Sequence, residues 1–201
     1  MIRKFIQKVF KKKQATVDTA NLEPRIYTRE QHGIAREGIS DCALRTTRSL
    51  QEAGFQAFVV GGAVRDLLLG REPKDFDVAT NATPAETRRV IRRSRVIGRR
   101  FQIVHALCGD EVVEVSTFRA MQTSAVVEEG ADETANAAHR TDAHGRVLRD
   151  NVFGTQAEDA VRRDFTVNAL YYDPKAEEVW DYGNGVQDVK RRILRIIGDP
   201  A

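Results

Sequence analysis

Two aspartates, Asp75 and Asp77, stand one residue apart in the middle of the chain. Side chains alternate between the faces of a β-strand, so a strand over residues 75–79 would place both carboxylates on one face. Two carboxylates in one small site repel each other unless a cation neutralises them, and hard oxygen ligands suit Mg²⁺ that substrate phosphates also hold. The pair therefore predicts a magnesium site, with a surface turn or helix cap as the alternative for an isolated Asp-x-Asp.

Two glycines, Gly61 and Gly62, follow a short apolar run at residues 55–60. Residues 63–69 have the pattern of a helix with Arg65 in its first turn, so we expect a strand, a glycine turn and a helix. Backbone N–H groups at such a turn can hold a triphosphate. The segment lacks the G-x-G-x-x-G of dinucleotide folds and the Gly-Lys-[Ser/Thr] of a P-loop. A plain strand-to-helix turn is the alternative.

Glu114 is an acidic residue inside an otherwise apolar strand pattern at residues 112–118. A buried carboxylate needs a partner, whereas a carboxylate on an edge strand would simply face water. His105 lies in the preceding strand pattern, and we expect a structural hydrogen-bonding role for it rather than metal ligation. Arg163 and Asp164, taken by themselves, would form an ion pair at a helix end.

Basic residues cluster in two places although the net charge is only +3. Residues 88–100 contain seven arginines and residues 3–13 contain six lysines and arginines, without an acidic residue in either stretch. Such runs suit a polyanion, with a solvated helix face and a basic tail as the alternatives. The arginines expected to contact RNA are Arg88, Arg89, Arg92, Arg93, Arg99 and Arg100.

The chain has 201 residues, 41% hydrophobic and 30% charged, which predicts one globular domain with appendages. Residues 1–14 have apolar side chains at helical spacing among lysines, without the pattern of a signal peptide or a membrane span. This segment could contact RNA or an anionic membrane surface. Cys42 and Cys108 have no partner at metal-ligand spacing, so we expect reduced core thiols in a cytoplasmic protein that could associate peripherally with a membrane.

The remaining patterns predict the elements that must position these residues. Helices are expected over residues 41–53, from a capping box at Thr83 to Arg93, and from a second box at Thr155 to about Arg163. Strands are expected within 96–108 and at 112–118, followed by a hairpin at 166–172 and 178–181 and a last helix and strand reaching Ile197. The fold class is α+β, a mixed sheet flanked by helices. Tyr171, Tyr172 and Trp180 are expected to pack the hairpin against the sheet rather than stack on bases.

Three motifs occur in a defined order: GGAVRD at residues 61–66, DFD at 75–77 and RRDFTVNA at 162–169. Together they resemble the superfamily of CCA-adding enzymes and bacterial poly(A) polymerases, over roughly residues 34–200. The resemblance implies a nucleotidyltransferase head with its active site on one face of the sheet. It also implies two Mg²⁺ ions, replaceable by Mn²⁺, of which one activates an RNA 3′-hydroxyl and the other stabilises the leaving pyrophosphate.

The resemblance assigns roles to individual residues. Asp75 and Asp77 hold the metal ions, and Glu114 and Asp164 complete the catalytic set. The residues implied to bind the nucleotide are Gly61, Gly62, Arg65, Arg163 and Asp164. Ala63, Ser116 and Ala120 depart from the usual family residues, and none of these three is an expected ligand.

The segments IGRRFQIVH at residues 97–105 and LRDNVFG at 148–154 are similar to the bacterial poly(A) polymerase pattern. This similarity implies addition of AMP from ATP to RNA 3′ ends, in RNA processing or decay, without a protein partner. A CCA-adding tRNA nucleotidyltransferase is the nearest alternative. A non-catalytic RNA-binding module is an alternative of another class, against which the intact acidic set argues.

The sequence is expected to divide into three parts. Residues 1–30 form a basic, flexible N-terminal segment, residues 31–165 form the head with a mobile loop at 120–149, and residues 166–201 form the hairpin and the start of a helical neck. In the family, helices after the segment at residues 197–200 recognise the base and grip RNA. The sequence ends at Ala201, so we expect these helices to be absent from it.

Overall fold

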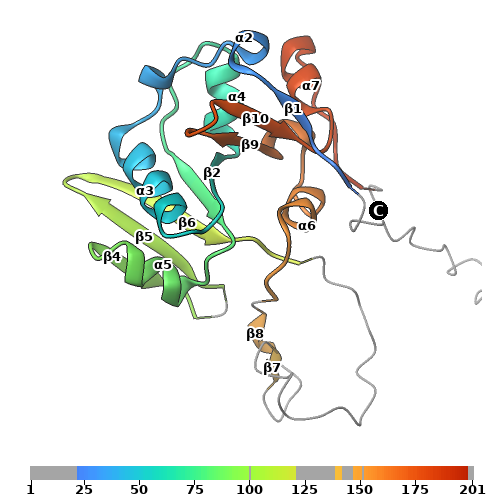
Figure 1. Cartoon of the computed structure of the whole chain (residues 1–201). Helices are drawn as coiled ribbons and strands as arrows, with labels where there is room; N and C mark the ends of the chain where they lie inside the picture. The colour runs from blue at the N-terminus through green and yellow to red at the C-terminus, as the bar shows by residue number, and fades with distance from the viewer. Residues whose placement is uncertain (1–21, 100, 121–138, 142–146, 151, 199–201) are drawn as a thin grey trace, which may run out of the picture.

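The computed structural model describes residues 22–99, 101–120, 139–141, 147–150 and 152–198. Its centre is an eight-stranded mixed sheet (Figure 1) with the strand order β1-β10-β9-β2-β3-β6-β5-β4. The strands are β1 (Arg25–Tyr27), β2 (Ala57–Val60), β3 (Asp77–Thr80), β4 (Ser94–Ile97), β5 (Ile103–Cys108), β6 (Glu111–Thr117), β9 (Leu170–Asp173) and β10 (Glu178–Asp181). Among these strands β3 and β6 pair in parallel and the other neighbours are antiparallel. The predicted α+β class is confirmed.

Helices cover both faces of the sheet. They are α2 (Arg29–His32), α3 (Asp41–Glu52), α4 (Gly62–Leu68), α5 (Pro84–Val90), α6 (Gln156–Val161) and α7 (Gly185–Arg191), with 3₁₀ turns at Arg36–Gly38 and Thr166–Asn168. The larger core packs α3 and α4 against the face that carries Val59, Val78 and Val115. On the opposite face Ala160 of α6 packs against Phe58, Phe118 and Tyr171. This second face also carries the acidic residues described below.

Capping residues set the helix starts where the sequence predicted them. The Ser40 side chain accepts a hydrogen bond from the N–H of Ala43 at the start of α3. Thr83 forms a capping box at the start of α5, and Thr155 forms one at the start of α6. The predicted end of α5 at Arg93 is wrong, because the helix stops at Val90. The Ser94 hydroxyl donates to the Ile91 carbonyl and the backbone turns into β4. Similarly, α6 ends at Val161, before Arg163.

Cys42 and Cys108 form a disulfide that joins α3 to β5, with 5.8 Å between their Cα atoms. The prediction of two reduced thiols was wrong. The cysteines are 66 residues apart in sequence, and only the packing of α3 across the sheet brings them together. The cytoplasmic location was predicted from two reduced thiols. Because the cysteines form a disulfide, and disulfides are uncommon in reducing compartments, they do not support that location.

The sheet extends beyond the part of the chain that the sequence assigned to the head. Strand β1 pairs with β10, although residues 25–27 were placed in the flexible N-terminal segment. The hairpin β9–β10 also belongs to the sheet, because β9 lies between β10 and β2. Tyr171 and Tyr172 are fully buried there, as expected for packing residues.

The expected loop at residues 120–149 contains part of a small two-stranded sheet, which pairs β7 (His139–Thr141) with β8 (Val147–Asp150). The mobility predicted for the rest of this loop, and the amphipathic pattern at residues 1–14, lie outside the described residues. None of the helices in the described part of the chain has the length and apolar character needed to cross a membrane.

Candidate active site

A row of directly paired residues crosses the sheet from β2 to β4. Val60 pairs with Asp77, Asp77 with Glu114, Glu114 with His105, and His105 with Arg95. Directly paired residues of neighbouring strands project from the same face, so Asp77, Glu114 and His105 share one face of the sheet. The carboxylates predicted from separate motifs are therefore neighbours.

Asp75 precedes the strand in which the sequence predicted it to lie. Strand β3 begins at Asp77, so Asp75 lies in the irregular segment before it, and strand alternation does not orient its side chain. Phe76 is 8% exposed and anchors the segment in the larger core. Asp75 still acts electrostatically on Asp77, because its charge contributes to the raised pKa of that carboxyl group.

The pKa of Asp77 reports the surroundings of its carboxylate. Partial burial raises this pKa, the charges of Glu114 and Asp75 raise it further, and the guanidinium of Arg163 lowers it. Asp77 as a whole stays open to solvent, while protein atoms partly desolvate its carboxylate. The Asp77 carboxylate therefore lies within electrostatic range of Glu114, Asp75 and Arg163.

The donor chemistry fits a divalent cation of the Mg²⁺ or Mn²⁺ type. Asp75, Asp77 and Glu114 offer hard oxygen ligands from two neighbouring strands and the segment before one of them. Within the described ranges, no group of three or more His, Cys, Asp or Glu side chains is already arranged to hold a metal ion. Mg²⁺ usually binds through one or two carboxylates plus substrate phosphates rather than in a closed protein cage. The acidic residues suit such a shared site.

The glycine turn follows β2 directly, next to the start of β3. Gly61 has φ of 71°, a backbone conformation that favours glycine, and α4 begins at Gly62. The Gly61 N–H donates to the carbonyl of Leu170 at 3.3 Å. That N–H is therefore engaged within the sheet, and the N–H groups without an intrahelical partner begin at Gly62.

A chain of polar contacts links this turn to the third motif. Arg65 Nη1 donates to Asn168 Oδ1 at 3.0 Å, and Asn168 Nδ2 donates to Asp164 Oδ1 at 3.4 Å. Arg65 also pairs with Asp66 at 2.9 Å. Asp164 is exposed, and its Oδ1 accepts the N–H of Phe165. The structure thus brings Arg65 and Asp164 together through Asn168, which the sequence reading did not single out.

Arg163 is held more firmly than its predicted role requires. Its guanidinium donates to Asp159 Oδ2 at 3.0 Å, to the Tyr171 hydroxyl at 3.1 Å and to the Asn168 carbonyl at 3.2 Å. The Tyr171 hydroxyl donates to the same carboxylate oxygen at 2.8 Å. The sequence reading missed Asp159, which lies in α6 four residues before Arg163, a spacing that is typical of an ion pair although the helix ends between the two residues. Arg163 therefore supplies a fixed positive charge beside Asp77.

The arginines predicted to bind RNA do not lie on one helix face. Arg88 and Arg89 belong to α5 and line a surface hollow of about 540 Å³ together with Val96 and Gln102. Arg92 and Arg93 are exposed in the turn after the helix, and Arg99 is exposed after β4. Arg100 lies outside the described residues.

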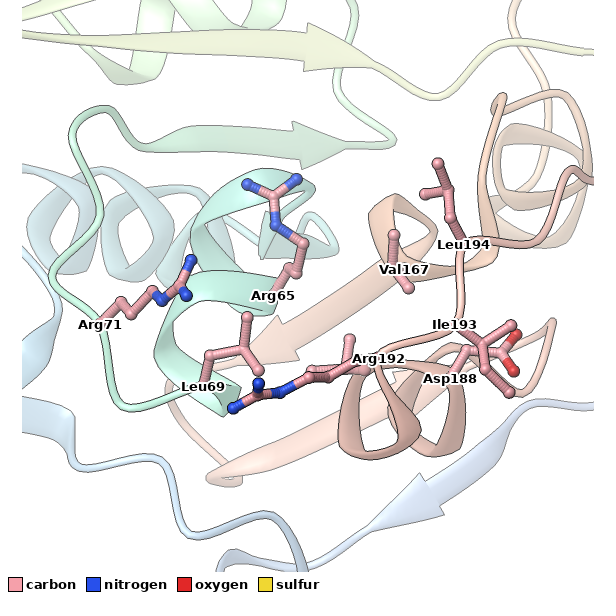
Figure 2. Close-up of a pocket in the computed structure, with 9 residues that line it drawn as sticks. Arg65, Leu69, Arg71, Val167, Asp188, Arg192, Ile193 and Leu194 are labelled. Atoms are coloured by element: carbon pink, nitrogen blue, oxygen red, sulfur yellow. The ribbon is translucent and has the colours of Figure 1, made fainter.

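A second hollow, of about 240 Å³, lies between α4 and the segment that follows α7. Figure 2 shows that Arg65, Arg71 and Arg192 surround it without their guanidinium groups converging on one point. Asp188 in its wall is already paired with Arg195 at 3.0 Å. This hollow is therefore not an extension of the acidic site.

Residues 57–195 match the family described as "Poly A polymerase head domain". The chain belongs to this family. It is 44% identical over 201 residues to Poly(A) polymerase I of Salmonella typhi, covering 99% of this chain and 42% of that protein. It is also 38% identical over 158 residues to the CCA-adding enzyme of Lactobacillus helveticus, covering 79% of this chain and 35% of that enzyme.

Among solved structures, the head is similar to the Bacillus stearothermophilus CCA-adding enzyme in complex with CTP. The TM-score is 0.59 at 30% identity, covering 78% of this chain and 33% of the other. This likeness confirms the predicted nucleotidyltransferase head fold. The chain spans 42% of the length of the Salmonella polymerase, so a whole polymerase contains a large part that this sequence does not.

Proposed function

We propose that this chain is the catalytic head of a poly(A) polymerase, which adds AMP from ATP to RNA 3′ ends. The observation that carries the proposal is the direct pairing of Asp77 with Glu114, beside the glycine turn and the fixed charge of Arg163. The identity of 44% to a relative named Poly(A) polymerase I, over nearly the whole chain, favours adenylate addition.

Each part of the site has a role in this proposal. Asp75, Asp77 and Glu114 would hold two Mg²⁺ ions, for which Mn²⁺ could substitute. Bound there, divalent ions would activate the RNA 3′-hydroxyl and neutralise the charge that develops on the pyrophosphate. The turn after Gly61 receives the nucleotide's phosphates on backbone N–H groups, starting with that of Gly62.

The polar chain from Arg65 to Asp164 offers the nucleotide both a donor and an acceptor. Asp164 is exposed, and its carboxylate can accept a hydrogen bond from a ribose hydroxyl. Asn168 donates to this carboxylate and fixes its orientation. Because the Arg163 guanidinium already donates to Asp159, Tyr171 and Asn168, this arginine acts on the site mainly through its charge. The arginines of α5 and the turn after it neutralise RNA phosphates.

CCA addition to tRNA is the second candidate, because the chain is 38% identical to the CCA-adding enzyme of Lactobacillus helveticus and 30% identical to that of Bacillus stearothermophilus. A non-catalytic RNA-binding module is the third candidate. Such a module does not need Asp75 and Glu114 so close to Asp77 that their charges raise the pKa of its carboxyl group.

One assay separates the three candidates. A generic RNA primer and a tRNA lacking its 3′ CCA are each incubated with Mg²⁺ and ATP, CTP, GTP or UTP, and the products are sequenced. We expect runs of A on the generic primer. Addition of C, C and A to the tRNA alone would identify a CCA-adding enzyme. RNA binding without any incorporation, equal in the wild type and in Asp77→Asn, would identify a binding module.

A further inference from the structure

His105 stands beside the third carboxylate of the site. Its Nε2 atom lies 3.4 Å from Oε1 of Glu114, across the directly paired strands β5 and β6. The same Nε2 atom is buried and makes no hydrogen bond within the described part of the chain. The expectation that His105 hydrogen-bonds as a structural residue is therefore not met at this atom.

The two side chains differ in freedom. The His105 side chain is 27% exposed, whereas that of Glu114 is 54% exposed. A glutamate in such an open position can adopt several rotamers, while a histidine held in a strand with its tip covered keeps one orientation. His105 is thus the more restricted partner, and Glu114 has the greater rotamer freedom.

Glu114 is placed between two unlike neighbours. On one side is Asp77, with a like charge, and on the other is His105, whose covered nitrogen needs a partner. A small rotation of the Glu114 carboxylate would turn the 3.4 Å approach into a hydrogen bond. It would then satisfy the buried nitrogen, which is otherwise unfavourable.

We propose that His105 is a positioning residue for Glu114. Its Nε2–H would donate to Oε1 and leave Oε2 free for a divalent cation that Asp77 would also bind. This proposal rests on the proposed metal-binding role of the acidic residues. His105 does not touch the cation or the substrate, and it acts through the orientation of Glu114, as residues that hydrogen-bond metal ligands commonly do.

The first test measures Mn²⁺ binding to the chain by electron paramagnetic resonance, without nucleotide or RNA. His105→Ala should weaken Mn²⁺ binding about tenfold or more. His105→Gln, whose amide can donate to the same oxygen, should recover part of this loss. Leu107→Ala is the matched control, because Leu107 lies two residues along β5, pairs with Val112 on the same face and should leave binding unchanged. Equal binding by the wild type and His105→Ala would overturn the proposal.

The second test asks whether His105 acts through Glu114. In a Glu114→Gln background, His105→Ala should weaken Mn²⁺ binding no further, because the carboxylate that it orients is gone. Two additive losses would show that His105 acts by another route and would overturn the proposal. Thermal melting of each variant checks the fold, and His105→Asn replaces His105→Ala if the latter does not fold.

Asp77→Asn distinguishes a failure of the metal-binding role of the acidic residues from a failure of the positioning role of His105. If this variant binds Mn²⁺ as well as the wild type does, the metal-binding role of the acidic residues is wrong and the positioning role fails with it. If Asp77→Asn loses binding while His105→Ala keeps it, only the positioning role is wrong. In nucleotide addition, His105→Ala should lower kcat and raise the Mg²⁺ concentration for half-maximal rate, with the KM for ATP little changed.

Discussion

Asp77 and Glu114 are direct neighbours on the parallel strands β3 and β6, and burial together with the Glu114 charge raises the pKa of Asp77. Such a pairing of like charges is unfavourable unless a cation binds between them. We therefore expect Asp77→Asn or Asp75→Asn to abolish nucleotide addition at saturating Mg²⁺, measured as incorporation of labelled AMP into an RNA primer. Near wild-type incorporation by either variant would contradict the metal-binding assignment. Asp110→Asn, in the exposed turn before β6, is the control.

The same pKa shift predicts how stability depends on pH without metal. A carboxyl group whose pKa is higher in the folded than in the unfolded protein binds more protons when folded, so its contribution lowers stability as pH rises between the two values. Above the folded value the penalty is complete. Asp77→Asn should therefore melt at a higher temperature than the wild type at pH 7 in EDTA. This difference should disappear below about pH 3.9, the ordinary aspartate value; a difference that persists there would have another origin.

The ion pair of Asp159 and Arg163 should matter for stability. The Asp159 side chain is 7% exposed and that of Arg163 is 22% exposed, so Asp159→Ala leaves a largely buried charge without its partner. We expect the free energy of unfolding in urea to fall by about 3 kcal/mol. Tyr171→Phe removes one hydrogen bond to the same carboxylate and should cost about 1 kcal/mol. Equal costs for the two variants would show that the ion pair adds little.

Salt dependence tests the RNA-binding arginines, and the end of α5 at Val90 allows two pairs to be compared. Changing Arg88 and Arg89 on the helix, or Arg92 and Arg93 in the turn, to alanine should reduce the slope of log affinity against log salt. For single-stranded RNA the reduction should be about 0.7 for each phosphate that the protein no longer neutralises. Arg48→Ala, an exposed arginine on α3 paired with Glu52, is the control. An unchanged slope for both pairs would mean that these arginines are only solvated.

The disulfide between Cys42 and Cys108 should stabilise the head mainly by restricting the unfolded chain. For a loop of 66 residues the chain-entropy relation gives about 4 kcal/mol at 25 °C. The double variant Cys42→Ala and Cys108→Ala should lose up to this amount in urea unfolding, and a reducing agent should destabilise the wild type but not the variant. Two free thiols in the purified, denatured wild type would contradict the disulfide.

Local patterns predicted the parts of this molecule that depend on neighbours in sequence. The capping residues Ser40, Thr83 and Thr155 start helices as expected, and Glu114 is a neighbour of Asp77 as the resemblance implied. The interactions that were missed join distant segments. Cys42 meets Cys108 only because α3 lies across the sheet, and Arg65 reaches Asp164 only through Asn168. The spacing of these residues in the sequence does not predict these contacts.

The place of β9 and β10 in the sheet has a consequence for the order in which the head can assemble on the ribosome. The strands β2 to β6, with Asp77 and Glu114, are made before β9 and β10 and can pair with one another. Strand β1 is made earliest, yet its partner β10 appears only with residues 178–181. Arg163, Asn168 and the Tyr171 anchor also follow late. During synthesis the acidic pair is therefore exposed before its compensating positive charge is fixed, and these long-range pairings predict that closure of the sheet is the slow step of folding.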